Sequence, residues 1–343
     1  MVKGMNNMTK MFFESLNGKR ISEKEFNIRY AHIESLRVVH PKFSEITSEV
    51  TKIHNLSKAN VKAEQLCIIG QTGAGKSSII ELYASKYPHV EEDERTQIPV
   101  LLVSVPPRAK SPRVLASKIL REMGDHFFDS GSEEHMTHRI CNYVDKCDIK
   151  MILLDEFHHL IDRDTDYVLA SASDWLKTFI DKVKIPVVLV GLPESERIFS
   201  YNEQLDGRYP NRMVLPPFSY TNKEDITEFR RFLVSIDNKL PLSKLSNLSD
   251  PELAAKIFYF SFGVPRYVMN LLKIATEISL NKGQDLISEI ELRGAFNRIT
   301  RSTRPYAINP FENTKFHLMD EIEKEKKLHE RLFQSEPKKG KRK

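Results

Sequence analysis

Eight consecutive residues at positions 70–77, reading GQTGAGKS, limit the fold of this chain more than any other segment. They match the pattern G-x-x-x-x-G-K-[ST], in which glycines allow backbone N–H groups to curl around phosphate oxygens. An apolar run at 65–69 precedes them and a helical pattern at 77–86 follows, so they join a predicted strand to a predicted helix. The sequence therefore predicts a phosphate-binding loop made of Gly70, Gln71, Thr72, Gly73, Ala74, Gly75, Lys76, Ser77 and Ser78.

Four residues have predicted roles in binding and hydrolysing a nucleoside triphosphate. Lys76 is expected to reach the β- and γ-phosphates of ATP, and the Ser77 hydroxyl is expected to bind Mg²⁺. An apolar run at 151–154 ends in Asp155 and Glu156. Because a phosphate-binding loop comes earlier in the chain, Asp155 is expected to organise the Mg²⁺. Glu156 is expected to activate the attacking water as general base. The adjacent acidic pair disfavours a small-molecule kinase and favours an ATPase.

Other metal and membrane chemistry is not indicated. His158 and His159 follow the acidic pair but lack the H-E-x-x-H spacing of a zinc helix, so we interpret them as helix-face or supporting residues. No apolar run approaches the roughly 20 residues of a membrane span, and the N-terminus lacks the apolar core of a secretory signal. Together with three cysteines that fit free thiols, this predicts a cytoplasmic protein without a membrane partner.

The order of predicted elements indicates an α/β fold with a parallel sheet flanked by helices. Strands are expected at 65–69, 100–105, 150–154, 186–190 and 213–215, with helices between them. After Pro217 only helices are expected, and before the sheet a helix begins at Ser22 with Glu25 completing a capping box. The predicted domains are an N-terminal helical extension (1–60), an α/β ATPase domain (61–218), a helical lid (219–300) and a basic, flexible tail (301–343).

Net charge gives little argument for nucleic acid. The chain carries +5, but its last ten residues contribute +4 of this. Any such argument must come from local pattern.

Three arginines are candidates for contacting the nucleotide. Arg208 lies just before the last predicted strand, and Arg212 competes with it four residues later. An arginine delivered to the γ-phosphate stabilises transition-state charge. Arg266 begins a helix of the all-helical block, in the sequence Gly263-Val264-Pro265-Arg266.

With these pieces in this order, the chain resembles AAA+ P-loop ATPases. The resemblance makes Arg208 the arginine finger, acting on a neighbouring subunit, and Arg266 the sensor-II arginine that binds nucleotide from the lid. One position departs from the family: the end of the fourth strand, usually polar, reads Val190-Gly191-Leu192-Pro193. This departure concerns the rate of hydrolysis rather than nucleotide binding, so slow, assembly-dependent turnover is expected.

More closely, residues 22–300 resemble the TniB/TnsC family, the AAA+ regulators of mobile elements that carry DDE transposases. The resemblance is carried by the segments RYAHIESLRVVHPKF, VLLVSVPPRAKSPRVLASKIL, VVLVGLPES, GRYPNRMVLPPFS and FGVPRYVMNLLKIA. It implies a protein that binds duplex DNA when loaded with ATP and assembles on it as a ring or helical filament. Such a protein recruits a DDE transposase to a site marked by a target selector, and ATP hydrolysis dismantles the assembly.

A local basic pattern fits this expectation. Basic residues cluster in and after the loop that follows the second predicted strand, which is typical of phosphate contacts without base readout. By resemblance, Arg113 occupies a position that touches the DNA backbone, and Ser132 lies near a second contact. The predicted DNA-binding residues are Arg113, Lys110, Ser132 and Lys118. No aromatic residues interleave with the basic ones, so base stacking is not expected.

Two other functions stay open. One is another DNA-linked AAA+ ATPase, of the replication-initiator or helicase-loader type. A C-terminal winged-helix domain would favour it, but the roughly 40 residues after the lid are too few for one. The other is a nucleotide-gated scaffold with negligible turnover, which the apolar residues at the end of the fourth strand favour.

Overall fold

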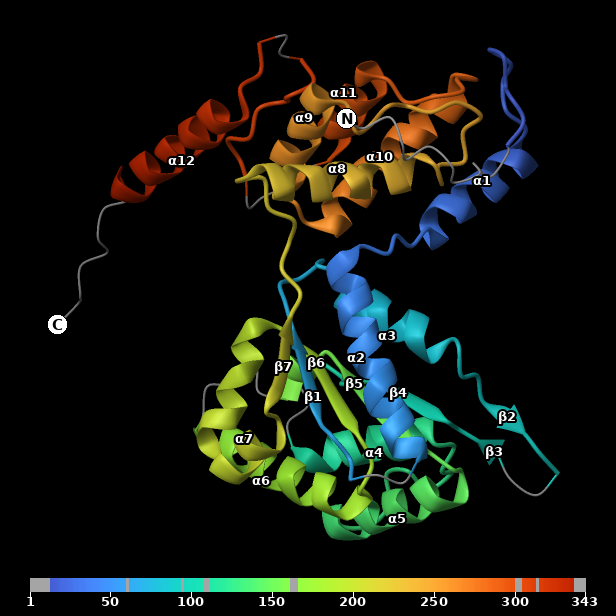
Figure 1. Ribbon diagram of the computed structural model, residues 1–343, viewed down its shortest axis with the longest axis vertical. Helices are drawn as coiled ribbons and strands as arrows, with labels where there is room; N and C mark the ends of the chain where they lie inside the picture. The colour runs from blue at the N-terminus through green and yellow to red at the C-terminus, as the bar shows by residue number, and fades with distance from the viewer. Residues whose placement is uncertain are drawn as a thin grey trace. The chain divides into compact units, whose positions relative to one another are not determined.

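The chain forms two compact units, which are described separately (Figure 1). The computed structural model describes residues 13–59, 62–93, 96–107, 111–160, 166–299, 304–312 and 315–335. One unit spans Val39–Pro216, and the other is built from the chain on both sides of it, up to Val38 and from Pro217. We call them the sheet unit and the helical unit.

The sheet unit is built on five parallel strands in the order β4-β5-β6-β1-β7. Their apolar residues are almost all buried because helices cover both faces of such a sheet. A separate antiparallel pair joins β2 (Val90–Glu91) to β3 (Thr96–Gln97). The strands of the main sheet are β1 (Leu66–Ile69), β4 (Val100–Ser104), β5 (Met151–Asp155), β6 (Val187–Gly191) and β7 (Asn211–Val214).

Helices cover the two faces of this sheet unequally. Alternate residues of β1 show the division: Leu66 and Ile68 join a core with α2 and α3, while Cys67 and Ile69 join a core with α4, α5 and α6. The parallel sheet and its flanking helices confirm the predicted fold class. The helices and 3₁₀ segments of the unit are α2 (Pro41–Lys58), α3 (Lys76–Ala84), α4 (Pro112–Glu122), α5 (Glu133–Lys146), η1 (Phe157–Leu160), α6 (Asp166–Val183), η2 (Pro193–Tyr201) and α7 (Glu203–Arg208).

The helical unit has a core of its own. It includes Phe229 of α8, Ile257 of α9 and Leu271 of α10, all fully buried. The helices of this unit are α1 (Glu23–Ser35), α8 (Lys223–Asp237), α9 (Pro251–Ser261), α10 (Pro265–Asn281), α11 (Glu289–Arg298) and α12 (Leu318–Ser335). No helix in the described part of the chain is long and apolar enough to cross a membrane.

The N-terminal helices belong to different units, whereas the sequence predicted one extension over 1–60. Ile33 of α1 packs in the helical core, and the phenyl and aliphatic side chains of α2 pack on the sheet. The Ser22 hydroxyl accepts the N–H of Glu25 at 3.3 Å, as predicted. The Glu25 carboxylate, however, binds the buried Arg29 at 2.6 Å, so only half of the predicted capping box forms among the described residues.

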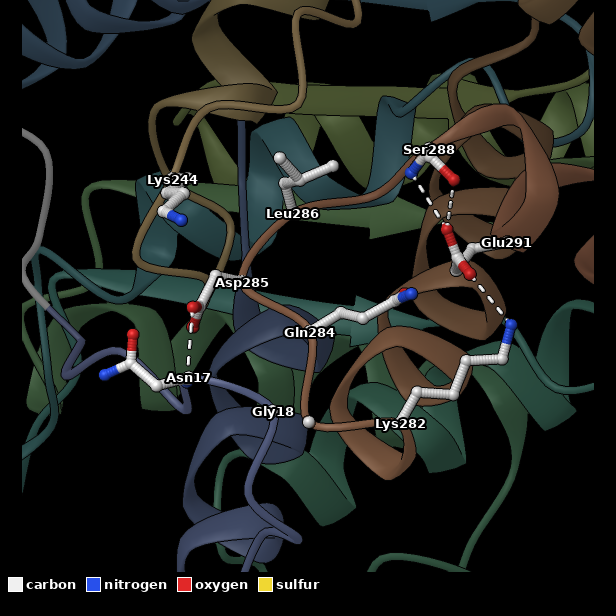
Figure 2. A pocket seen from close by; sticks show the side chains of 10 residues that line it. Asn17, Gly18, Lys244, Lys282, Gln284, Asp285, Leu286, Ser288 and Glu291 are labelled. Atoms are coloured by element: carbon white, nitrogen blue, oxygen red, sulfur yellow. Dashed lines mark hydrogen bonds and ion pairs between the residues drawn. The ribbon is translucent and has the colours of Figure 1, made fainter.

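A chain segment before α1 docks on the loop after α10 (Figure 2). Asp285 accepts the N–H groups of Leu16 at 2.7 Å and Asn17 at 3.3 Å, and the Ser15 hydroxyl donates to it at 2.5 Å. The Gly18 N–H donates to the Gly283 carbonyl at 3.0 Å. One carboxylate therefore holds the beginning of the described chain to the helical unit.

The tail that the sequence analysis placed at 301–343 contains a helix, α12. Arg304 links this helix to α9: its guanidinium donates to both oxygens of Glu325, at 2.8 and 2.5 Å, and to the Tyr259 carbonyl at 2.6 Å. Both charged side chains are buried, and the Arg304 guanidinium also lies 4.0 Å from the centre of the Phe262 ring. The basic end, residues 336–343, lies outside the described residues.

Candidate nucleotide-binding site

The predicted phosphate loop lies at the carboxyl edge of the sheet, directly after β1. Gly70 is required there, because a Cβ at this position would lie 2.3 Å from the Leu215 carbonyl oxygen. Gly73 and Gly75 have φ angles of +82° and +109°, a region that side chains disfavour. Gly75 is also the N-cap of α3, so the first N–H groups of this helix face the loop and can bind phosphate.

Lys76 closes the loop on itself. Its ammonium group donates to the Gly70 carbonyl at 2.6 Å and to the Gln71 carbonyl at 3.1 Å. The side chain is buried within the loop that a triphosphate would occupy. Phosphate oxygens are better acceptors for this cation than the two neutral carbonyls, because their negative charge adds a Coulombic attraction.

Asp155 and Ser77 form an oxygen-donor pair beside Lys76. Burial raises the pKa of Asp155, while its hydrogen bond to the Ser77 side chain, the N–H of Glu156 and the charge of Lys76 oppose the rise. The Glu156 N–H bond to Asp155 Oδ1 is 2.8 Å long. A hydroxyl and a carboxylate suit the preference of Mg²⁺ for oxygen ligands, so these residues fit the metal predicted for them.

Glu156 stands in an uncommon backbone conformation. Its φ is +55°, which for a residue other than glycine is rare and is concentrated at functional sites. Its carboxylate Oε2 lies 3.2 Å from His158 Nε2 and 3.9 Å from His159 Nε2. These three side chains, which the sequence did not link to a metal, bring their ligand atoms within 4.8 Å of one another.

The carboxyl end of β6 has a polar neighbour that the sequence analysis missed. A Cβ on Gly191 would lie 2.5 Å from the Ser195 hydroxyl oxygen, so the glycine allows η2 to approach the strand. Ser195 is fully buried, and its hydroxyl has no hydrogen-bond partner among the described residues. The sequence analysis treated the end of this strand, residues 190–193, as apolar. It therefore missed the Ser195 hydroxyl, which the following turn brings close to the strand.

Arg208 lies at the opposite edge of the sheet from the phosphate loop of its own chain. It ends α7, three residues before β7 begins, whereas Gly70 lies beside Leu215 after β7 ends. A strand of four residues spans about 13 Å, so the arginine and the loop are separated by the height of the sheet. Its guanidinium binds Asp181 of α6 at 2.5 and 2.7 Å.

Arg212 is held within the same unit. Its guanidinium bonds Asp206 and the Tyr209 carbonyl and lies 4.1 Å from the centre of the Phe199 ring. These contacts hold Arg212 within its own unit, as the pair with Asp181 holds Arg208. Arg266 is exposed at the start of α10 in the helical unit, after a turn in which Gly263 has a φ of +70°.

The predicted DNA-binding residues fall on α4 and the start of α5. Arg113 donates from Nη2 to the Asp129 carbonyl at 2.7 Å and from Nε to the Gly131 carbonyl at 3.3 Å. Ser132 caps α5 by accepting the N–H of His135, and Lys118 pairs with Glu122 at 2.5 Å. Arg113 thus links the first turn of α4 to the loop before α5. Lys110 lies outside the described residues.

A comparison with protein-family models shows to which family this chain belongs. The family model for the bacterial TniB protein matches residues 29–220, more than half of the chain. The chain belongs to the TniB family. This is a family of AAA+ transposition proteins, and it is the family that the sequence predicted. No curated protein sequence matches this TniB-family chain.

Solved structures similar to the TniB-family chain share its fold. The Aeropyrum pernix ORC2 protein, in ADPNP–ADP complexes, matches with a TM-score of 0.56 and 16% identity, over 81% of this chain and 74% of that one. The Aeropyrum pernix ORC1 protein in complex with DNA matches with 0.56 and 18%, over 79% and 69%. Cdc6p from Pyrobaculum aerophilum matches with 0.57 and 12%, over 81% and 71%. At these identities the likeness concerns the AAA+ fold.

Proposed function

We propose that this TniB-family protein is an ATPase that regulates DNA transposition in the cytoplasm. Loaded with ATP, it assembles as a ring or filament on duplex DNA and recruits a DDE transposase to a target marked by a selector protein. Hydrolysis then dismantles the assembly. The observation that carries the proposal is the grouping of Lys76, Ser77, Asp155 and Glu156 at one edge of the sheet, in a chain of this family.

The nucleotide step follows from these residues. The N–H groups at the start of α3 and the Lys76 ammonium bind the phosphates, and the lysine exchanges its two carbonyl acceptors for phosphate oxygens. Ser77 and Asp155 would hold Mg²⁺, which neutralises charge on the β- and γ-phosphates. Glu156 accepts a proton from the attacking water, and His158 holds the Glu156 carboxylate at 3.2 Å until water and ATP are in place.

The position of Arg208 supports assembly-dependent turnover. Because it lies at the sheet edge opposite its own loop, we expect it to act on the nucleotide of a second copy of the chain. An arginine supplied in trans can raise hydrolysis by about 10³–10⁵-fold. Arg266 would sense nucleotide from the helical unit, as the family resemblance implies.

DNA binding is the second half of the proposal. Arg113 has no carboxylate partner among the described residues, so its charge is available to phosphate. One of the similar structures is itself a complex with DNA, which supports the proposal by analogy only. Affinity that rests on phosphate contacts falls steeply with salt and depends weakly on sequence.

The experiment is fluorescence anisotropy of a random-sequence duplex, with ATP, a non-hydrolysable analogue and ADP compared at two salt concentrations. Cooperative binding with ATP or the analogue but not with ADP is the expected result. Lys76→Ala should remove the nucleotide effect, and Lys86→Ala, an exposed lysine beyond α3, serves as the matched control. Binding that ignores the nucleotide would contradict the proposal.

A nucleotide-gated scaffold is the second candidate. Two observations favour it. The residues at the end of β6 are apolar, and the Glu156 carboxylate, the proposed general base, is already in contact with His158. Turnover of the assembled protein separates the two functions, because a scaffold would bind ATP and DNA with no phosphate release above that of a Glu156→Gln variant.

A further inference from the structure

The loop between α4 and α5 carries an aromatic side chain into solvent. Phe127 is 69% exposed, although full burial of a phenylalanine is worth about 1.5–3 kcal/mol. Its neighbour Phe128 is partly buried against the core of the sheet unit. The exposed ring therefore contributes little to the fold that holds it.

The backbone of this loop is fixed by two buried or half-buried charged side chains. Asp125 accepts the Phe127 N–H at 2.8 Å, and the Arg139 guanidinium donates to the Phe127 carbonyl at 3.0 Å and to the Ser130 carbonyl at 2.8 Å. Arg139 and Asp125 also pair with each other at 3.1 Å. The ring is thus presented on a preorganised support, so a partner that binds it need not order the loop.

Two arginines contact the loop that carries Phe127. Arg113 donates to the Asp129 carbonyl, two residues after Phe127, and the Arg121 guanidinium lies 5.6 Å from the centre of the Phe128 ring. Exposed carboxylates at Asp129 and Glu134 offset part of this positive charge. Phosphate attraction alone is therefore modest at this surface, and an apolar contact would add affinity that the charges do not supply.

We infer that Phe127 is a DNA-contacting wedge, whose ring enters the minor groove of the bound duplex and partly unstacks a base step. Apolar side chains flanked by arginines act in this way on DNA, and the unstacking is offset by the added contact. The inference rests on the proposed function, because it requires duplex DNA on this surface. The sequence analysis did not expect it, since Phe127 is separated along the chain from Arg113, which contacts its loop.

The test uses duplex DNA with 2-aminopurine at one step, whose fluorescence rises when stacking is lost, and the full chain with a non-hydrolysable ATP analogue. The wild-type protein should raise the fluorescence. Phe127→Ala should abolish the rise and weaken binding by about 5- to 150-fold, the range for loss of one aromatic–base contact. Val90→Ala, at a residue of the same unit that is 47% exposed, is the control and should change neither readout.

A second variant separates the wedge from the charge. Arg113→Ala should lower the salt dependence of binding by about one phosphate contact and keep a fluorescence rise at saturating protein. Equal melting temperatures for Phe127→Ala and the wild type are expected, because the ring is exposed and its loop is held through backbone groups.

The outcomes are distinct. Salt-dependent binding with no change of either readout in Phe127→Ala would overturn the wedge and leave DNA binding intact. Loss of self-association by Phe127→Ala in the absence of DNA, measured by sedimentation, would assign the ring to a contact between copies and also overturn it. Failure of the wild type to bind duplex with any nucleotide would overturn the proposed function itself.

Discussion

Arg208 and Asp181 form a two-pronged ion pair, with 2.5 Å from Nε to Oδ1 and 2.7 Å from Nη2 to Oδ2. The hydrogen bond from Arg208 lowers the pKa of Asp181 and raises that of the arginine, so the pair stays charged. The side chain proposed to act on a neighbouring nucleotide is therefore held in a defined place before assembly. A guanidinium uses two of its five N–H groups in such a pair, and others remain for a phosphate.

Arg208→Ala should leave ATP binding intact and lower assembly-dependent turnover by about 10³–10⁵-fold. Phosphate release measured against protein concentration checks this, because the wild-type rate per subunit should rise with concentration and the variant rate should stay flat. Asp181→Asn is the companion variant and should keep most of the turnover. Unchanged turnover in assembled Arg208→Ala would remove the arginine from the reaction.

Glu156→Gln should reduce turnover by about 10²–10⁴-fold, since the amide cannot accept a proton from water. ATP should still bind, because the phosphate contacts come from the loop and Lys76, and the ATP-loaded assembly should persist on DNA. Glu194→Gln, at an exposed acid of η2, should behave like the wild type. If the assembly of Glu156→Gln decays as fast as that of the wild type, hydrolysis is not what dismantles it.

Gly70→Ala should destabilise the sheet unit by about 1–3 kcal/mol and abolish ATP binding, because the new methyl group would overlap the Leu215 carbonyl. Gly207→Ala provides the matched control: nothing lies within 4 Å of a Cβ there, and its position in α7 favours alanine. Thermal denaturation of both variants tests the difference. Equal melting temperatures would show that β1 and the segment after β7 separate at no cost.

Asp285→Asn should weaken the docking of residues 13–22 on the helical unit. Burial raises the pKa of Asp285, but hydrogen bonds from Ser15, Leu16 and Asn17 outweigh it and lower the pKa from 3.8 to about 2. A lowered pKa means that the ionised form stabilises the fold fully above about pH 4 and that this stabilisation is lost as the pH falls through about 2. We expect a loss of about 1–2 kcal/mol at pH 7 that becomes smaller as the pH falls to about 2.

Denaturant titrations at several pH values measure this difference. Asp320→Asn, at an exposed acid of the same unit, should follow the wild type throughout. A difference from the wild type that is the same at pH 7 and pH 2 would mean that the carboxylate charge is not what holds the segment.

The sheet and its loop could be predicted because their signals are local. The apolar run before Gly70 and the one before Asp155 each specify a buried strand, and the glycines at 73 and 75 have the positive φ angles that their pattern predicts. The predicted last strand, 213–215, lies where β7 forms, although β7 begins at Asn211. The extra residues, Asn211 and Arg212, pair with β1. They are polar, so the local pattern of apolar residues did not predict them as part of the strand.

What escaped the sequence analysis depends on contacts between distant residues. The partner of Arg304 is Glu325, and this pair holds a helix in a stretch whose sequence is typical of a charged tail. Ser195 matters because Gly191 lets its hydroxyl approach the strand, and Phe127 because Arg139 holds its carbonyl. None of these relationships has a fixed spacing along the chain.

The split between α1 and α2 has a consequence for synthesis. The helical unit starts before Val38 and resumes at Pro217, so the sheet unit is inserted within it. While the chain emerges from the ribosome, the inserted unit has all of its residues long before Ile33 and Arg29 can meet α8 and Pro241. Since units of a chain generally fold as they are completed, the nucleotide-binding half should form first, and α1 must wait for its partners.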